Sequence, residues 1–451
     1  MKRDLAATRV FVDVSHTFRS AENTGIQRVV RKLANLLPQL AEHGGVECEL
    51  VIMRKGRFWS QPRGSRRLPV CSLDESKARF INCIPTILLP SGVADGHDDS
   101  GPRSWNINSG LLKTPFQAFW KWERYASKLQ FSQEIDFRPG DVLVMPDGYW
   151  SLEEIWTAVS NAKEKGVQIA SVVYDLICLT HPQFFPEKTR AAFERYIGCV
   201  LEQADFIATI SNVVKRQLEN LIGRTKPNNA RPYVASFRLG ADHHAMEGAI
   251  RPELRKIFDG ESPYLMVATF EPRKNHQFVM KAFENLWHAG REEKILFAGT
   301  IGWQCSDVLE YIQNHPHLNK QVFALHDLTD AEIGFCYSAA KGVITASDTE
   351  GFGLPIVEGK RYGRNVLASD TEVHREVGRE ACTYFSLQDC AHLSAAIEYC
   401  EQLRSSGKYR DPEPSSVESW DDSAAEFLRN LFEFLPQKTG YEQSKRKVVA
   451  A

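Results

Sequence analysis

The chain has 451 residues, of which 43% are hydrophobic and 25% charged, and its formal net charge is -2. This length and composition predict a globular protein of two or three domains. A charge balance so close to zero argues against a dedicated nucleic-acid binder, which usually carries a basic excess along one face.

Cysteine usage and the N-terminus indicate the compartment. The ten cysteines are scattered without a Cys-x-x-Cys pair, which indicates reduced thiols in a cytosolic protein. Asp4, Arg9 and Asp13 interrupt the apolar residues of "MKRDLAATRVFVDVSH", so we expect no signal peptide. No apolar run reaches the roughly eighteen residues of a membrane span.

Strand-like and helix-like segments alternate through the first half of the chain. "RVFVDVS" (9–15) predicts a strand, and "GIQRVVRKLANLLPQLAEH" (25–43) repeats apolar residues at helical spacing. Further strands are expected at 46–53, 141–146, 167–175, 204–211 and 231–237, with helices near 153–165, 188–203 and 212–222. Continuous apolar strands that alternate with helices indicate a parallel sheet covered on both faces.

The alternation restarts after a polar break at roughly 243–262. Six strands are expected at 263–269, 293–299, 321–327, 342–347, 365–369 and 382–386, with helices between them. The fold class is therefore α/β, with two doubly wound Rossmann-like domains, 1–245 and 246–419. A helix at 420–435 is expected to bury Leu428, Leu431, Phe432 and Leu435 on one face, and the polar tail 436–451 is expected to be flexible.

An insertion at about 54–140 interrupts the first domain. It contains a basic run at 54–67 and the aromatic segment "TPFQAFWKWERYASKLQF", in which Phe116, Phe119 and Trp120 recur at helical spacing with basic residues nearby, within 113–131. Such residues suit an interfacial helix on anionic lipid, and a helix packed on the sheet beside a solvated basic loop is the alternative. The pair Asp98-Asp99 has no strand before it and is expected in a solvated loop, so no metal site is predicted there.

The stretch "ASDTEGFGLPIVEGKRYG" (346–363) at first suggests a P-loop, because glycines precede a Gly-Lys pair. A P-loop requires Gly five positions before its Gly-Lys and Ser or Thr after the Lys. Leu354 and Arg361 occupy those positions, so the stretch is not a P-loop.

Two loops that follow predicted strands carry the candidate chemistry. After 263–269, Arg273 and Lys274 precede a helix that starts near His276, an arrangement that suits a diphosphate. Two solvated surface charges are the alternative. Open α/β sheets bind ligands beyond the carboxyl ends of their strands, which favours the ligand-binding interpretation.

After 342–347, Gly351 and Gly353 let the backbone approach a ligand, and Pro355 suits the first turn of a helix. Because a phosphate repels a carboxylate, Glu350 and Glu358 are expected to accept hydrogen bonds from hydroxyl groups, such as those of a ribose and a sugar. A helix-capping Glu and a surface Glu are the alternative.

These residues resemble a known family. "EPRKN" followed by "EGFGLPIVE" is similar to the signature of glycosyltransferase family 4, which are retaining nucleotide-sugar transferases of the GT-B fold. "GTIGW", "LTDAEIGFCYSAAKGVITAS", "NVLASD", "ISNVVKRQL" and "RLGAD" resemble family segments in the expected order. "DVSHTFRSAENTGIQRVVRKLANLL" and "VYDLICLTHPQFFPE" are similar to bacterial mannosyltransferases of O-antigen and related polysaccharides.

The resemblance implies two Rossmann-like domains that face each other across a cleft, with the 420–435 helix crossing back to the first. It implies retaining transfer of a hexose, mannose from GDP-mannose, to a lipid-linked saccharide acceptor in surface polysaccharide biosynthesis. Another nucleotide sugar (rhamnose, glucose or GlcNAc) and a non-catalytic GT-B protein that binds sugar nucleotide or glycan are the alternatives. A nicotinamide-dependent oxidoreductase is disfavoured, because no Gly-x-Gly-x-x-Gly follows a strand.

The resemblance also implies roles on the donor side. Arg273 and Lys274 would bind the diphosphate and offset charge on the leaving nucleotide. Glu358 would hold the ribose hydroxyls and Glu350 those of the donor sugar. The backbone amides of Phe352, Gly353 and Leu354 would complete the donor site.

For the first domain it implies that Gly25 lets the backbone approach the donor phosphates and that Arg28 contacts acceptor or phosphate. Asp175 would lie on the acceptor side, with a turn-capping carboxylate as the alternative, and Tyr174 stands where many relatives have His. No metal, cofactor or protein nucleophile is implied. The expected location is the cytoplasm, with peripheral contact to the inner face of the membrane through 54–67 and 113–131.

Overall fold

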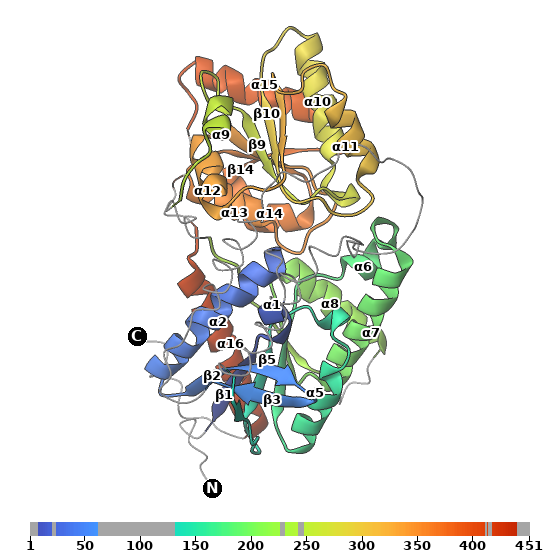
Figure 1. Ribbon diagram of the computed structural model, residues 1–451, viewed down its shortest axis with the longest axis vertical. Coiled ribbons are helices and arrows are strands. Elements are labelled where there is room, and N and C mark those ends of the chain that lie inside the picture. The colour runs from blue at the N-terminus through green and yellow to red at the C-terminus, as the bar shows by residue number, and fades with distance from the viewer. Residues whose placement is uncertain are drawn as a thin grey trace, which may run out of the picture. The chain divides into compact units, whose positions relative to one another are not determined.

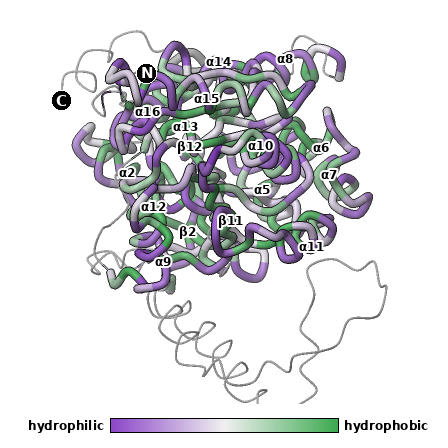
Figure 2. The backbone as a smooth tube through the Cα atoms, turned by 90° about the horizontal axis from the view of Figure 1, so that it is seen from above, coloured by the Kyte–Doolittle hydropathy of each residue, from purple (hydrophilic) through white to green (hydrophobic). Residues whose placement is uncertain are grey.

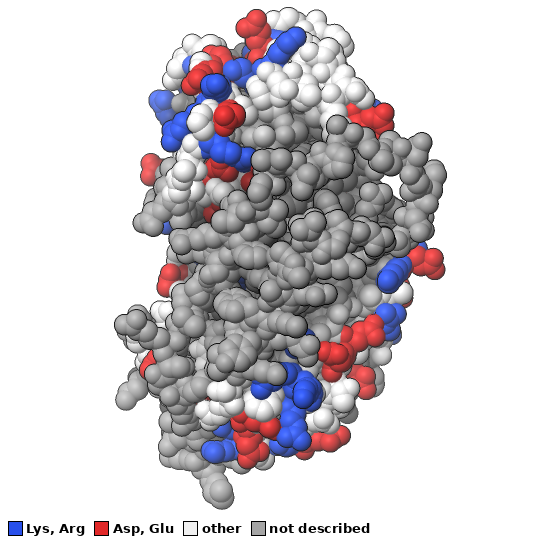
Figure 3. Space-filling model, viewed as in Figure 1, with Lys and Arg blue, Asp and Glu red and all other residues white. Residues whose placement is uncertain are grey.

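The computed structural model of the chain describes residues 8–19, 24–61, 131–225, 231–241, 248–410, 413 and 417–439. It divides into two compact units, 1–169 and 170–451. Figure 3 shows basic and acidic side chains interspersed on the described surface in view, as expected for a chain with a formal net charge of -2.

The first unit contains a mixed sheet. Its strands are β1 (Arg9–Asp13), β2 (Glu47–Arg54), β3 (Arg57–Ser60), β4 (Gln133–Glu134) and β5 (Val142–Met145). They run in the order β4-β3-β2-β1-β5, with β1 parallel to β2 and β5, and β3 antiparallel to its neighbours. The helices are α1 (Ser15–Arg19), α2 (Gly25–His43) and α5 (Ile155–Glu164), and the short 3-10 helix η2 (Tyr149–Ser151) follows β5.

The start of the insertion differs from the expected basic loop. Residues 57–60 form β3, which pairs with β2 across a turn whose residues Lys55 and Gly56 have positive φ. The sequence concealed this hairpin because charged residues surround the short apolar core of β3. Residues 62–67 of the basic run and 113–130 of the aromatic segment lie outside the described residues. Phe131, at the end of that segment, is described and is buried.

The second unit begins with three parallel strands. They are β6 (Gln168–Val173), β7 (Phe206–Thr209) and β8 (Tyr233–Ser236), paired in that order. Between them lie α6 (Ile177–Thr180), α7 (Glu187–Gln203) and α8 (Asn212–Thr225). Each strand and helix matches a predicted segment to within a few residues, apart from the short α6.

The second sheet of this unit has six parallel strands: β9 (Tyr264–Val267), β10 (Ile295–Ala298), β11 (Val322–Leu325), β12 (Gly342–Thr345), β13 (Val366–Ser369) and β14 (Cys382–Phe385). Their order is β11-β10-β9-β12-β13-β14. The helices are α9 (Pro252–Ile257), α10 (His276–His288), α11 (Ser306–Gln313), α12 (Asp330–Ala339), α13 (Leu354–Arg361), α14 (Glu372–Gly378) and α15 (Ala391–Ser405), and Figure 1 shows them around the sheet.

Alternation along the strands explains why helices cover both faces of this sheet. Tyr264 and Met266 of β9 pack in one apolar cluster with residues of α10 and α15, whereas Leu265 packs in a second cluster with residues of α12. Hydrophilic and hydrophobic colours alternate along the helices in Figure 2, as expected when one face of each helix is buried. The predicted doubly wound α/β architecture is confirmed.

The last helix, α16 (Trp420–Thr439), packs on β7 and β8. The ring of Phe427 lies 5.4 Å from that of Phe237, and the ring of Phe434 lies 5.5 Å from that of Phe206. Leu428, Leu431 and Leu435 are buried as predicted, but Phe432 is only half-buried. The prediction was wrong for Phe432 because the apolar stripe is centred on Phe427 and Phe434. The helix also continues four residues beyond its predicted end.

Among the residues that the structure describes, no helix has both the length and the apolarity needed to cross a bilayer. The domain boundaries at 245/246 and 419/420 remain predictions.

Candidate functional site

The strand order of the six-stranded sheet reverses between β9 and β12. From β9 the chain proceeds through β10 to β11 at one edge, and from β12 through β13 to β14 at the other. In open α/β sheets a ligand binds outside the carboxyl ends of the strands at such a switch point. The loops after β9 and β12 are the two that carry the predicted site residues.

Two hydrogen bonds tie these loops together. The side-chain amide of Asn275 donates to the carbonyl of Ala346 at 2.9 Å, and the backbone N–H of Asp348 donates to the carbonyl of Arg273 at 2.9 Å. Asn275 has a φ of 60°, a left-handed conformation that Asn tolerates better than most residues. The loop after β9 is therefore fixed against the loop after β12 before any ligand binds.

The predicted cations and the first predicted carboxylate are in direct contact. Glu350 accepts from Arg273 Nη1 at 2.9 Å, from the hydroxyl of Ser347 at 2.7 Å, and from Lys274 Nζ. Arg273 Nη2 also pairs with Glu271 at 2.6 Å. The side chains of Arg273, Lys274 and Glu350 are 15%, 14% and 11% exposed. The structure thus brings these three residues into one nearly buried ion-pair cluster.

The cluster holds its charges firmly. Burial alone would raise the pKa of Glu350, but Lys274 and Arg273 outweigh it and hold that pKa well below its usual range. Burial opposes the charge of Arg273, yet Glu350 and Glu271 raise its pKa. Burial raises the pKa of Glu271, and Arg273 partly offsets this shift. Glu350 and Glu271 together balance the charges of Lys274 and Arg273, so an incoming anion competes with these carboxylates for the two cations.

One donor of the cluster has no acceptor. The Nε–H of Arg273 is buried and makes no hydrogen bond within the described ranges of the chain. Leaving a buried donor unpaired costs about 1–3 kcal/mol. A ligand oxygen that reached this atom would recover that cost.

The glycine turn after Glu350 is held by the protein's own backbone. A Cβ on Gly351 would lie 2.2 Å from the carbonyl oxygen of Tyr174, and the carbonyl of Gly351 accepts from the hydroxyl of Ser211 at 2.8 Å. Gly353 has a φ of 98°, which an L side chain rarely adopts. The sequence suggested close approach to a ligand at Gly351, but the close approach in the structure is to Tyr174. Phe352 is buried, and α13 begins at Leu354 with Pro355 in its first turn, as predicted.

Glu358 lies on α13 and is only 2% exposed. Its Oε2 accepts a hydrogen bond from the hydroxyl of Tyr337 at 2.6 Å, and the ring of Tyr337 stacks on that of Tyr362. The orientation of this carboxylate is therefore set by a fully buried tyrosine from α12.

His374, on α14, lies against the glycine turn. It is fully buried, and its Nδ1 is 2.9 Å from the carbonyl oxygen of Ser369, so this nitrogen carries the proton. Burial lowers the pKa of His374, so the imidazole is neutral. A Cβ on Gly353 would lie 3.3 Å from Cδ2 of this ring, which therefore supports the turn from below.

Asp175 follows β6. Its Oδ1 accepts from the backbone N–H of Ile177 at 2.9 Å and caps the turn into α6. Burial raises the pKa of Asp175, while the Ile177 hydrogen bond and the charge of Arg273 oppose the shift. The carboxylate is therefore a turn cap that also lies within the field of the Arg273 cluster.

Gly25 and Arg28 belong to the first unit. Gly25 is exposed as the first residue of α2, and a capping box of Thr24 and Gln27 fixes that end of the helix. Arg28 is half-buried in the same first turn. The roles that the resemblance implies for both residues remain predictions.

Sequence reasoning missed several residues that hold the cluster. Glu271 directly precedes Pro272-Arg273 and could have been found as the acid of "EPRKN". Ser211, Ser347 and Tyr337 gave no signal, because they act through tertiary contacts that no local pattern reveals.

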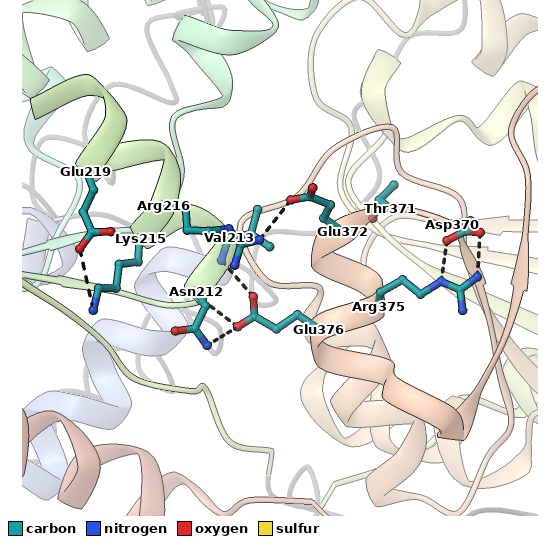
Figure 4. Close-up of a pocket in the computed structure, with 10 residues that line it drawn as sticks. All are labelled: Asn212, Val213, Lys215, Arg216, Glu219, Asp370, Thr371, Glu372, Arg375 and Glu376. Carbon is teal, nitrogen blue, oxygen red and sulfur yellow. Dashed lines mark hydrogen bonds and ion pairs between the residues drawn. The ribbon is translucent and has the colours of Figure 1, made fainter. Parts of the chain in front are cut away.

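A pocket of about 910 Å³ lies between α8 and α14 (Figure 4). Its basic side chains are all paired: Lys215 with Glu219, Arg216 with Glu372, and Arg375 with Asp370. Glu376 of α14 accepts from the backbone N–H groups of Asn212 and Val213 at 2.7 and 2.9 Å. None of the predicted site residues lines this pocket, and its cations are already neutralised. We therefore do not assign a diphosphate to it.

Comparison with known proteins covers most of the chain. The family profile described as Glycosyl transferases group 1 matches residues 252–411. The chain is 30% identical over 409 residues to the serotype-specific mannosyltransferase WbdA of Escherichia coli, a match that covers 84% of this chain and 48% of that protein. The chain spans about half the length or less of three curated relatives that it matches.

Solved structures share the fold over nearly the whole chain. A glycosyltransferase from Rickettsia africae superposes with a TM-score of 0.55 at 15% identity, covering 95% of this chain and 98% of its own. Anabaena HepE in complex with UDP and glucose superposes with a TM-score of 0.52 at 11% identity, covering 96% of this chain and 98% of its own. The expected GT-B class of fold is thereby confirmed.

Proposed function

We propose, from the premise that this chain belongs to the group 1 glycosyl transferases, that it is a retaining hexosyltransferase that uses a nucleotide-diphosphate sugar. The observation that carries the proposal is the cluster of Arg273, Lys274 and Glu350 at the switch point between β9 and β12. Two fixed cations in a nearly buried site suit a diphosphate, and an adjoining carboxylate suits the hydroxyl groups of a sugar.

The reaction assigns these residues separate tasks. The bond between the sugar C1 and the phosphate oxygen breaks with its electron pair on the phosphate, and the acceptor hydroxyl oxygen bonds to C1. Arg273 and Lys274 stabilise the charge that develops on the leaving diphosphate. The proton of the acceptor hydroxyl passes to the leaving phosphate oxygen, so no side chain has to act as nucleophile or final base.

The remaining donor contacts complete the proposal. Glu350, released from the cations by the diphosphate, accepts hydrogen bonds from the donor sugar. Glu358 holds the ribose, and the amides of Phe352, Gly353 and Leu354 face the donor. Gly25 and Arg28 act from the first unit. Asp175 acts on the acceptor side.

The mannosyltransferase relatives, one of which is an O-antigen chain mannosyltransferase of Escherichia coli, support mannose as the transferred sugar. Within this proposal the donor is GDP-mannose and the acceptor is a lipid-linked saccharide of a surface polysaccharide. Anabaena HepE, solved with UDP and glucose, favours a uridine nucleotide as the second candidate. A thermal-shift panel of GDP-mannose, UDP-glucose, UDP-GlcNAc and dTDP-rhamnose decides between them, because a bound donor raises the melting temperature by mass action.

The test of the site uses matched lysine variants. Lys274→Ala is expected to lower transfer by about 10²–10³-fold, the usual cost of one preorganised charge donor. Lys281→Ala changes an exposed lysine on α10 and is expected to leave transfer unchanged. Full transfer by folded Lys274→Ala and Glu350→Ala variants would remove the basis of the site assignment.

The same proposal includes domain roles and location. Residues 1–245 form the acceptor-side domain, with its insertion at about 54–140, and 246–419 form the donor-binding domain. The helix at 420–435 crosses back to the first. The flexible tail was predicted from 436 onward, but 436–439 continue α16, and 440–451 lie outside the described residues. The enzyme acts in the cytoplasm, with peripheral membrane contact through 54–67 and 113–131. Co-sedimentation with vesicles that is insensitive to anionic lipid and to charge reversal at Arg63, Arg66 and Arg67 would contradict that contact.

A further inference from the structure

The first unit contains a second switch point, between β1 and β5. From β1 the chain proceeds to β2, β3 and β4 at one side, whereas β5 pairs with β1 on the other side. Asp13 ends β1, and Asp147 lies two residues after the end of β5. Both carboxylates are 0% exposed. By the rule for open sheets, the edge of the sheet beside these two residues is where a ligand of the first unit is expected.

The carboxylate of Asp13 is hydrogen-bonded within the protein. Its carboxylate accepts from the hydroxyl of Ser15 at 2.5 Å and from the hydroxyl of Tyr149 at 2.9 Å. The Ser15 hydroxyl accepts in turn from the backbone N–H of Met53 at 2.6 Å. Burial raises the pKa of Asp13 to about 7 in spite of these bonds. Asp13 therefore links β1, β2 and the segment after β5 through hydrogen bonds.

Asp147 instead orients a partly exposed side chain. It accepts from the backbone N–H of Thr17 at 2.6 Å, and its Oδ1 lies 3.3 Å from Nδ1 of His16. The His16 side chain is 22% exposed. This contact is within ion-pair distance and is not one of the hydrogen bonds of the structure. The nearby Asp147 charge favours a proton on Nδ1, which leaves Nε2, at the opposite edge of the ring, as the acceptor of the neutral imidazole. The adjoining Thr17 is 2% exposed, and its hydroxyl has no hydrogen-bond partner among the described residues.

The surroundings restrict the class of ligand. The buried carboxylate of Asp147 disfavours phosphate and other anions close to it. Across the described part of the chain, no three His, Cys, Asp or Glu side chains converge so as to hold a metal ion. An uncharged molecule rich in hydroxyl groups meets neither obstacle. The acceptor of the proposed reaction has this chemistry.

We propose that His16, oriented by Asp147, binds the saccharide acceptor by accepting a hydrogen bond from one of its hydroxyl groups. This inference rests on the proposed function and adds an acceptor subsite to it. Asp147 is a positioning residue that acts through His16. A purely structural pair would serve only to close the turn at the start of α1, and the experiment below separates these two roles.

Two substitutions of His16 test the roles of its two ring nitrogens separately. His16→Asn keeps a polar atom near the position of Nδ1, within reach of Asp147, but removes Nε2. His16→Gln carries its amide out to about the distance of Nε2. The probes are GDP-mannose, or the nucleotide sugar that the thermal-shift panel selects, and α-linked mannotriose. His43→Asn, which changes an exposed histidine at the end of α2, is the matched control.

We expect His16→Asn to raise the KM for mannotriose about three- to tenfold, the cost of one lost hydrogen bond, with kcat changed less. His16→Gln is expected to recover part of that loss, and Asp147→Asn to raise the same KM. The melting-temperature increase caused by nucleoside diphosphate should be the same in all variants and in wild type.

Two results would overturn the inference. One is a wild-type KM for mannotriose in folded His16→Asn, because a structural pairing with Asp147 survives in that variant. The other is a parallel loss of nucleotide stabilisation and of acceptor affinity, which marks a general disturbance of the fold. Failure of the proposed function is distinct from both: the wild-type protein would then gain no stability from any nucleotide sugar.

Discussion

Replacing Glu350 by Gln separates two functions of the ion-pair cluster, which are diphosphate binding and sugar transfer. The substitution keeps the shape of the side chain and removes its charge, so Arg273 and Lys274 lose their shared counter-charge and only Glu271 remains paired with Arg273. A diphosphate then no longer competes with the carboxylate. We expect nucleoside diphosphate to bind more tightly to Glu350→Gln than to wild type, although transfer falls.

The magnitude follows from the geometry. At 2.9 Å and an effective dielectric of 20, one Arg273–Glu350 contact corresponds to about 6 kcal/mol of direct attraction. Most of that is cancelled by the cost of removing both groups from water. We expect Glu350 to oppose diphosphate binding by a net free energy of about 1–2 kcal/mol. Removing its charge should therefore raise the affinity for nucleoside diphosphate about five- to thirtyfold. The ligand-free variant should be less stable than wild type by about 1–3 kcal/mol, because two nearly buried cations lose a partner.

The assay is calorimetric titration of GDP and UDP, alongside urea unfolding with and without nucleotide. The low pKa of Glu350 means that its ion pairs are lost only as the pH falls through that value, so the difference should be constant from pH 6 to 8. Lys281→Ala again serves as control. Weaker nucleotide binding by Glu350→Gln together with undiminished transfer would refute the reasoning.

Four further predictions follow from other contacts. Tyr337→Phe removes the hydrogen bond to Glu358 and should weaken nucleotide binding about three- to tenfold. A nucleotide that lacks the ribose hydroxyl groups held by Glu358 should bind to this variant as tightly as to wild type, and an equal loss for both nucleotides would contradict the ribose assignment. Gly351→Ala forces a Cβ against the Tyr174 carbonyl and should cost about 1–3 kcal/mol of stability in urea unfolding, and an unchanged midpoint would show that the turn can shift freely. Glu376→Gln weakens the cap on α8 and should cost about 0.5–2 kcal/mol in the same assay, whereas the exposed neighbour Glu372→Gln should cost less. Since the pKa of Asp13 is raised from 3.8 to about 7, its protonated form stabilises the fold below pH 3.8 and this contribution is lost as the pH rises to 7; Asp13→Asn should flatten the stability profile across that interval, and an unaltered slope would contradict the assignment.

The sequence predicted those features that are specified by short, continuous stretches of the chain. Apolar runs such as 342–345 specify strands, and Pro355, two residues after Gly353, specifies a helix start, so the doubly wound fold followed from local pattern alone. Arg273, Lys274 and Glu350 could be placed together because the loops after parallel strands meet at one edge of a sheet.

The rest depends on contacts between distant segments. Glu350 was expected to face a sugar, but in the ligand-free protein it neutralises the two cations, since a nearly buried charge must be paired. The need for glycine at 351 comes from the Tyr174 carbonyl, about 180 residues earlier in the chain. Tyr337 and Asp147 gave no sequence signal, because a tyrosine in a helix or an aspartate after a strand is common and only tertiary structure gives it a partner.

The carboxylate of Glu350 also determines which anions can bind to Arg273 and Lys274. Cells contain many small monoanions besides nucleotide sugars. An anion that offers no more charge than one carboxylate gains little by exchanging with Glu350, whereas a diphosphate offers two charged groups and can reach the unpaired Nε–H of Arg273. In the ligand-free protein we therefore expect small anions to bind weakly to Arg273 and Lys274. Tight binding is expected only for a ligand that can displace Glu350 from both cations.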